Sequence, residues 1–239
     1  MKDLTGRTAI VTGSTRGIGR AIAEALLDAG ASVVINGRDD RTTSAVAEQL
    51  SGRGKVLGVA ADVADPLSCE RLVAESVASL GGLDILINNA GVGVFGSIAE
   101  LSWDDFRRQV DVNLGGVWAC TRAALPHFKR SDDAWVINIG SLAGRNAFAG
   151  GTGYNASKFG LVGMTEAMML DLRHDNVRVS IVMPGSVNTE FSGEPAPRRG
   201  WKLEPVDCAL AVMQLLSFPR EAHVSRIEMR PSRPPQRDR

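Results

Sequence analysis

Tyr154 and Lys158, in the stretch GTGYNASKFG, are the residues whose types and spacing most directly suggest chemistry. They are four positions apart, and side chains at that spacing lie on one face of a helix. A free tyrosine hydroxyl titrates near pH ~10, and a positive charge beside it lowers this pKa by stabilising the phenolate. Ser141 follows an apolar run that is typical of a strand, so its hydroxyl would lie at the strand's carboxyl end, within reach of a substrate carbonyl. The pattern predicts a proton-transfer site, although Tyr-x-x-x-Lys also arises by chance on solvated helix faces.

Composition limits the kinds of partner that this chain can have. The 239 residues are 44% hydrophobic, which is enough for a sizeable core, and 27 basic residues balance 27 acidic ones. With a pI of about 6.8, no overall field favours nucleic acid or an anionic membrane, so we expect a small-molecule partner. The cysteines Cys69, Cys120 and Cys208 show neither a disulfide framework nor the spacing of a metal site. No signal peptide or membrane span is evident, and a cytoplasmic protein is the expectation.

Apolar runs alternate with helical patterns along the chain. Strands are predicted at 7–12, 31–37, 55–63, 82–91, 133–140, 176–185 and 224–230, and helices at 18–30, 39–52, 65–81, 103–128, 154–172 and 204–217. Strands that are continuously apolar and separated by helices indicate a parallel sheet covered on both faces. We therefore predict an α/β fold with a single doubly wound parallel sheet of about seven strands. One domain would span 1–230, followed by a proline- and arginine-rich tail at 231–239.

The turn TGSTRGIG at 12–19 joins the first predicted strand to the first predicted helix. Glycines allow close backbone approach, and the helix directs free N–H groups at whatever lies in the turn. A pyrophosphate is the natural occupant, because ligands of such sheets bind at the carboxyl ends of the strands. A plain strand-to-helix turn is the alternative.

The second predicted strand ends in Asn36-Gly37-Arg38, where a protein that prefers NAD usually offers an acid to the ribose hydroxyls. Arg38, together with Arg16 in the first turn, could instead hold a 2′-phosphate. The sequence therefore favours NADP(H), with NAD(H) possible. Arg38 and Arg41 could also merely cap the following helix in solvent.

Seven motifs or residues follow one another along the chain: TGSTRGIG, Asp62 after the third strand, NNAG at 88–91, Asn113, Ser141, YNASK and PGSVNT at 184–189. In these, the chain resembles the short-chain dehydrogenase/reductase family, which implies a Rossmann fold and an NAD(P)-dependent oxidoreductase. The resemblance assigns cofactor binding to Gly13, Ser14, Thr15, Arg16, Gly17, Ile18, Gly19, Arg38, Asp62, Val63, Asn89, Ala90, Gly91, Tyr154, Lys158, Pro184, Gly185, Val187 and Thr189.

The same resemblance implies the catalytic roles. Tyr154 would be the general acid in reduction and the general base in oxidation. Lys158 would lower the pKa of Tyr154 and hold the nicotinamide ribose, while Ser141 would orient the carbonyl oxygen. Asn113 would hold a water that links Lys158 to solvent.

Substrate and assembly are less closely defined. The residues expected to line the substrate side are mostly apolar and suggest a ketone, an aldehyde or a 3-oxoacyl group with an apolar or aromatic body: Val92, Val94, Phe95, Phe148, Met183, Phe191 and Trp201. A homodimer or homotetramer would pair through the helix at 103–128 and the helix of Tyr154. The segment FSGEPAPRRGWKLEP is short for a substrate loop, and IEMRPSRPP stands where many relatives carry a glycine pair.

Two other functions are compatible with the same fold. One is a non-catalytic NADP-binding sensor or scaffold, which the complete set of Asn113, Ser141, Tyr154 and Lys158 disfavours. The other is epimerisation or enoyl reduction, which is disfavoured by the lack of an extra substrate domain and by the four-residue spacing of the tyrosine and lysine.

Overall fold

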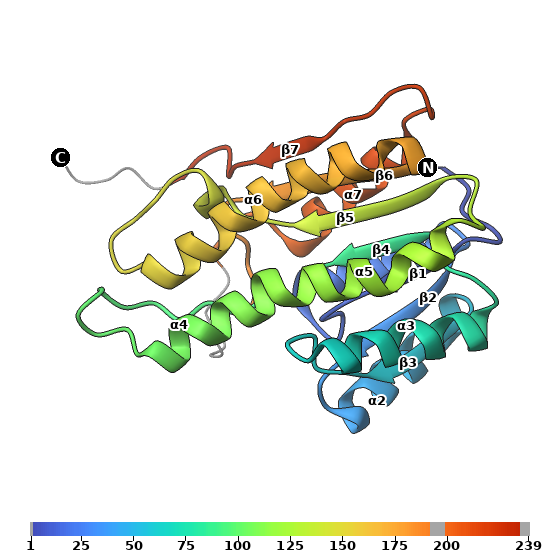
Figure 1. The fold of residues 1–239 in the computed structure, drawn as a ribbon, viewed down its shortest axis with the longest axis horizontal. Coiled ribbons are helices and arrows are strands. Elements are labelled where there is room, and N and C mark those ends of the chain that lie inside the picture. Colours follow the sequence, from blue (N-terminus) through green and yellow to red (C-terminus); the bar gives the residue numbers. More distant parts are fainter. Residues whose placement is uncertain (1, 192–198, 235–239) are drawn as a thin grey trace.

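The computed structural model describes residues 2–191 and 199–234. Within them, parallel strands form one seven-stranded sheet in the order β3-β2-β1-β4-β5-β6-β7 (Figure 1). The strands are β1 (Thr8–Val11), β2 (Ser32–Gly37), β3 (Val56–Ala60), β4 (Ile85–Asn88), β5 (Ala134–Ile139), β6 (Val177–Pro184) and β7 (Arg226–Met229). The predicted fold class is confirmed. The strand order reverses between β1 and β4, the kind of position where ligands bind in such sheets.

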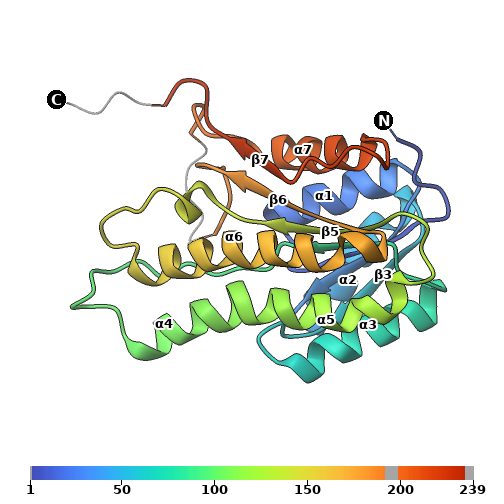
Figure 2. The same ribbon diagram turned by 45° about the horizontal axis from the view of Figure 1, so that its top comes forward.

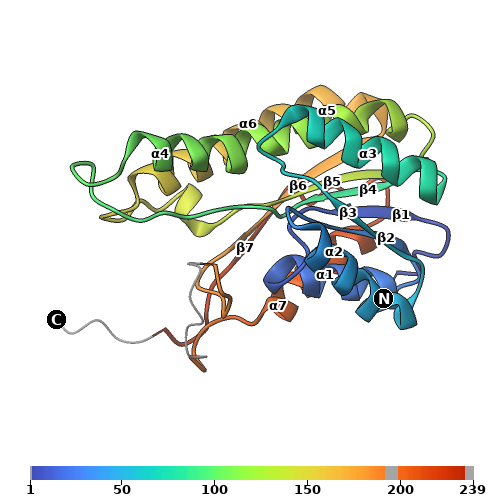
Figure 3. The same ribbon diagram turned by 90° about the horizontal axis from the view of Figure 1, so that it is seen from below.

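Helices cover both faces of the sheet, as the turned views show (Figures 2 and 3). They are α1 (Gly17–Asp28), α2 (Asp40–Leu50), α3 (Pro66–Leu80), α4 (Trp103–Val110), α5 (Gly116–Phe128), α6 (Thr152–Leu172) and α7 (Pro205–Ser217). The helices α1, α2 and α7 pack on one face, and α3, α5 and α6 pack on the other. Neighbouring residues of β1 serve both layers: Ala9 and Val11 belong to the first core and Ile10 to the second. This explains why the strands read as continuous apolar runs rather than alternating ones.

Capping side chains determine where α3 and α4 begin. Asp65 accepts hydrogen bonds from the backbone N–H groups of Leu67 and Ser68, and Pro66 occupies the first turn, as the sequence predicts. Ser102 caps α4 by accepting from the N–H of Asp105 at 3.0 Å. The carboxyl ends of β4 and β5 lead into the long loops at the left of Figure 1, towards which their arrowheads point.

The predicted helix at 103–128 is not one regular helix. A π-helical segment, Asp111–Gly115, separates α4 from α5 and has Asn113 at its centre. Such segments often mark functional sites, because the extra residue per turn redirects a side chain that a regular helix would direct elsewhere.

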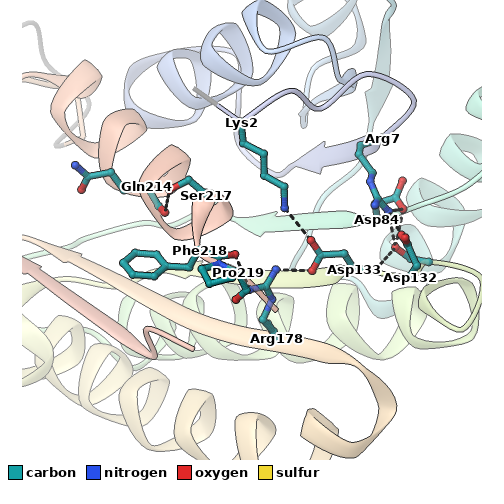
Figure 4. Close-up of polar contacts among 11 residues, drawn as sticks. Lys2, Arg7, Asp84, Asp132, Asp133, Arg178, Gln214, Ser217, Phe218 and Pro219 are labelled. Atoms are coloured by element: carbon teal, nitrogen blue, oxygen red, sulfur yellow. Dashed lines mark hydrogen bonds and ion pairs between the residues drawn. The ribbon is translucent and has the colours of Figure 1, made fainter. Parts of the chain in front are cut away.

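A cluster of charges closes the opposite, amino-terminal edge of the sheet (Figure 4). Arg178 pairs with Asp133 and donates to the carbonyls of Phe218 and Pro219, while Lys2 donates to the other oxygen of Asp133 at 2.8 Å. The Arg178 guanidinium also lies 3.8 Å from the ring centroid of Trp135. This cluster fastens the amino terminus and the end of α7 to β5 and β6, at the edge of the sheet away from the predicted site.

Two predictions fall partly outside the described residues: the tail at 231–239 and the segment that follows Phe191. Among the helices that the structure describes, none is both long enough and apolar enough to cross a bilayer. The described ranges also hold no cluster of three or more histidine, cysteine, aspartate or glutamate side chains suited to a metal ion.

Candidate active site

Ser141, Tyr154 and Lys158 are brought together by the end of β5 and the start of α6. Ser141 lies two residues past β5 and caps a 3-10 turn, Leu142–Gly144, by accepting from the N–H of Ala143 at 3.1 Å. Tyr154 and Lys158 lie in the first two turns of α6, on the face that points back to β5. The Ser141 hydroxyl is near enough to the Tyr154 phenol to favour its charged form. The grouping predicted from the sequence is therefore present.

Lys158 is a buried lysine with 4% of its surface exposed. Its ammonium nitrogen donates to the carbonyl of Ile139, the last residue of β5, at 3.0 Å. Burial disfavours the charged form and lowers the pKa of Lys158 to about 8. Such a residue holds its proton weakly, and an anion or a set of hydroxyls placed beside it would raise this pKa again.

The pKa of Tyr154 does not follow the expectation drawn from its spacing to Lys158. Burial raises this pKa above the ordinary value, and the nearby Ser141 hydroxyl opposes the rise only in part. The lysine nitrogen lies 5.8 Å from the centroid of the tyrosine ring. Tyr154 is therefore a neutral phenol, suited to giving up a proton rather than accepting one.

Asn113 ties the loop after β4 to the helices. Its Oδ1 accepts from the N–H of Val92 at 2.9 Å, and its Nδ2 donates at 2.9 Å to the carbonyl of Val92 and to the hydroxyl of Ser157. Both amide hydrogens are thus in use. A water bound by this side chain would have to donate to Oδ1.

The first turn has the geometry of an anion site. Gly13 has φ of 61°, and a Cβ there would lie only 2.8 Å from the Cα of Ala90, so that no other residue fits without a shift. Asn89 clamps this turn by donating to the carbonyls of Thr12 and Gly13, both at 2.9 Å. At the start of α1, the N-cap residue Arg16 makes no side-chain capping bond and the first turn has no acid. The positive end of this helix is therefore available to a phosphate.

The two predicted phosphate-binding arginines differ in their surroundings. The exposed Arg38 has no hydrogen bond or ion pair to any residue of the described ranges. Arg16 instead pairs with Glu190 at 3.3 Å, on the segment that follows β6. Asp39 caps α2 by accepting from the N–H of Thr42 at 2.8 Å, so neither Arg38 nor Arg41 is needed for that cap.

The remaining predicted cofactor residues surround the same edge of the sheet. Asp62 is exposed and accepts from the N–H of Ala64 at 3.0 Å, while Val63 is buried beneath α5. Beyond β6, the methyl carbon of Thr189 lies 3.5 Å from a Cβ built on Gly17, so the two turns face each other. The other predicted residues lie at the same edge of the sheet: Ser14 and Thr15 after β1, Ile18 and Gly19 in the first turn of α1, Gly91 after β4, and Pro184, Gly185 and Val187 at the end of β6 and just beyond it.

Three aromatic side chains gather beside Tyr154. The rings of Phe95 and Phe191 both meet the Tyr154 ring edge-on, with centroid distances of 5.5 Å and 5.7 Å. Phe148 lies against Phe95 at 5.9 Å. Met183 is wrong as a substrate-lining prediction, because it is fully buried in the core that β6 shares with α5 and α6.

Some positioning residues were not found from the sequence. Asn155 donates to the carbonyls of Ala143 and Asn146 and so shapes the loop that carries Phe148. Gln109 accepts from the N–H of Val94 at 3.1 Å. The position of Asn155 beside Tyr154 was the available signal, whereas Gln109 and Glu190 gave none, because their partners are distant in the sequence.

The geometry agrees with the comparisons to known proteins. Residues 7–199 match the family model described as short chain dehydrogenase. An uncharacterized oxidoreductase of Staphylococcus aureus (strain USA300) is 35% identical over 231 residues, covering 97% of this chain and all of that protein. The chain therefore belongs to the short-chain dehydrogenase family and is an oxidoreductase of that class.

Solved structures are similar over nearly the whole chain. An alcohol dehydrogenase from the archaeon Thermococcus sibiricus, complexed with 5-hydroxy-NADP, has a TM-score of 0.90 and 28% identity, covering 97% of this chain and 99% of its own. A metagenomic short-chain oxidoreductase in complex with NADP has a TM-score of 0.84 and 34% identity, covering 98% and 100%.

Proposed function

We propose that this protein is an NADP(H)-dependent oxidoreductase that interconverts a carbonyl and an alcohol on a substrate with an apolar body. The observation that carries the proposal is that Ser141, Tyr154 and the buried Lys158 come together at the carboxyl end of β5. A ketone, an aldehyde or a 3-oxoacyl group fits this arrangement.

The cofactor part rests on the phosphate-binding geometry. The open amino end of α1 and the glycine turn fit a pyrophosphate, and Arg38 and Arg16 fit a 2′-phosphate. The carboxylate nearest to the end of β2, that of Asp39, is already bonded to Thr42. The two solved relatives hold NADP or an NADP derivative, which supports the same preference.

When bound, a nicotinamide cofactor supplies a hydride to the carbonyl carbon, or accepts one from the alcohol carbon. In reduction, the electron pair of the C=O π bond moves to oxygen, and that oxygen takes the phenol proton of Tyr154. The Ser141 hydroxyl donates to the same oxygen and stabilises its developing charge. The ammonium of Lys158 then favours the phenolate that remains, and Asn113 fixes the loop that borders this path.

The test makes two measurements on each of two variants. Turnover is the rate of NADPH consumption with a panel of ketones, aldehydes and acyl thioesters, and NADPH affinity is measured by fluorescence. Tyr154→Phe should lower turnover by about two to four orders of magnitude and leave NADPH affinity nearly intact, because only the proton carrier is lost. Lys158→Ala should lower both turnover and affinity. Full activity in Tyr154→Phe would overturn the proposal, and a non-catalytic NADP-binding sensor would show no turnover to lose.

The proposal includes assembly and location. Large apolar side chains are exposed along α4, α5 and α6, and they suit a homodimer or homotetramer: Trp103, Trp118, Phe159 and Leu170. The three cysteines are buried and unpaired, as expected for a protein of the reducing cytoplasm.

A further inference from the structure

Three phenylalanines stand out because they are large, apolar and half exposed at the proposed site. Phe95, Phe148 and Phe191 have 50%, 47% and 40% of their surface exposed. They come from three different loops, which follow β4, β5 and β6. Large apolar side chains that gather beside a candidate site without being buried mark a place where a ligand can complete the contact.

The three rings converge on the ring of Tyr154. Phe95 and Phe191 approach it at interplanar angles of 71° and 62°, and Phe148 continues the group from Phe95 at 50°. We call Phe95, Phe148 and Phe191 the phenylalanine box. Tilted and edge-on contacts are those that aromatic rings make with one another in preference to face-to-face stacking. A further aromatic ring entering the box would find the same kind of contact.

Gly93 makes the box possible. A Cβ on this residue would lie 2.5 Å from Cε1 of Phe191 and 3.1 Å from Cζ of Phe95. Both rings thus lie over bare backbone, where any side chain would push them away. The residues on either side of Gly93 are held independently of the box, Val92 by Asn113 and Val94 by Gln109.

The carboxylates closest in sequence to the phenylalanine box already have hydrogen-bond or ion-pair partners. Glu190 pairs with Arg16, and Glu100 accepts from the hydroxyl and the N–H of Ser97. The carboxylates nearest in sequence to Phe191 and Phe95 are thus held by other groups. An apolar group is therefore favoured between the rings over a charged one.

We propose that the substrate carries a phenyl-sized aromatic ring, attached to the carbonyl carbon directly or through one methylene group, and that the phenylalanine box holds this ring. The inference rests on the proposed carbonyl reduction, because it is the Tyr154 hydroxyl that defines where the carbonyl oxygen lies. Since Phe95 and Phe191 contact the Tyr154 ring itself, a ring held by them lies within a few bonds of that oxygen.

The test uses a matched pair of ketones, 1-phenylpropan-2-one and 1-cyclohexylpropan-2-one. Their carbonyls are electronically alike, so that a difference in kcat/KM reports the ring. Each aromatic contact contributes roughly two- to tenfold beyond the area buried, and with two such contacts we expect a preference for the phenyl ketone of about tenfold or more. Binding of both ketones to the complex with NADP⁺ is measured in parallel by saturation-transfer NMR, which needs no turnover.

Substitutions in the box test whether its three rings cause the preference for the phenyl ketone. Phe95→Leu, Phe148→Leu and Phe191→Leu keep an apolar side chain and should bring the phenyl/cyclohexyl ratio towards one. Gly93→Ala keeps all three rings but displaces them, and should lower the ratio as well. Phe218→Leu is the control, because Phe218 is partly exposed at the opposite edge of the sheet, and it should leave the ratio unchanged.

The outcomes separate this inference from the proposed function. Reduction of both ketones with equal kcat/KM, or a ratio unchanged in every box variant, would overturn the aromatic box and leave the oxidoreductase in place. Selective binding of the phenyl ketone without reduction would support the box and contradict the proposed reaction on these ketones. Equal binding of the two ketones, or no binding of either, would overturn the box.

Discussion

The ammonium nitrogen of Lys158 lies 5.8 Å from the ring centroid of Tyr154 and is bonded to the last carbonyl of β5, that of Ile139, at 3.0 Å. Burial opposes charge on both side chains, so that it lowers the pKa of the lysine and raises that of the tyrosine. The site therefore favours a neutral phenol beside an ammonium that is easily deprotonated. This relationship leads to the first two predictions.

The titration of Tyr154 can be followed directly, because it is the only tyrosine of the chain. In the free protein its pKa should lie above the ordinary value of 10.0, as burial requires. Ser141→Ala should raise this pKa further, since the hydroxyl that favours the phenolate is lost. The ultraviolet absorbance of tyrosinate against pH measures both values. Ser217→Ala, on α7, is the control, and a pKa below 10.0 in the free protein would contradict the structure.

Lys158 should make the stability of the protein depend on pH. Its pKa is 10.5 ordinarily and about 8 when folded, so the folded state binds fewer protons between those values and this contribution to stability rises with pH there. Below pH 8 the buried charge costs about 3 kcal/mol. Lys158→Met should therefore raise the free energy of unfolding at pH 7 by up to that amount, less the lost bond to Ile139, and the gain should shrink above pH 8.

Denaturant unfolding at several pH values measures this difference. Lys129→Met replaces an exposed lysine and should show no such trend. A gain for Lys158→Met that stays constant from pH 7 to pH 10 would show that its charge is not the cause. NADPH affinity should fall in Lys158→Met even as stability rises.

Cofactor preference should depend on Arg38. Arg38→Asp removes a charge-assisted bond to the 2′-phosphate and adds repulsion, so that preference should shift towards NAD by ~2 kcal/mol or more, on the order of thirtyfold. Fluorescence titration of both cofactors measures the shift. Arg41→Asp makes the same charge change on the first turn of α2 and should have a smaller effect.

Glu190 gives a second measure of the same preference. Its carboxylate neutralises Arg16, so Glu190→Gln should tighten NADPH binding by a few-fold at most, because both partners are exposed. Equal affinities for NADP and NAD in the unmutated protein would contradict the proposed role of both arginines.

Self-association should involve the exposed apolar face of α4, α5 and α6. Trp118→Glu places a charge on that face and should lower the molar mass observed by light scattering, whereas Leu67→Glu, exposed on α3, should not. The unmutated protein should exceed the 25.4 kDa of one chain at micromolar concentration. A monomer under those conditions would refute the expected homodimer or homotetramer.

The sequence by itself determined the fold class and the placing of the site. Continuous apolar strands separated by helices require a doubly covered parallel sheet, and such a sheet brings residues that follow its strands to one edge. Ser141, Tyr154 and Gly13 could therefore be assigned to one place. Local capping was also predictable at Asp65 and Ser102, because a cap depends on side chains within one helical turn.

Only the tertiary structure decided what depends on burial or on partners far apart in the chain. The spacing of Tyr154 and Lys158 predicted a lowered tyrosine pKa, but burial is a property of the packed molecule and moves that pKa upwards. The pairing of Arg16 with Glu190 joins residues on two different turns. Phe95, Phe148 and Phe191 form one box only because β4, β5 and β6 are neighbours in the sheet, which places their following loops side by side.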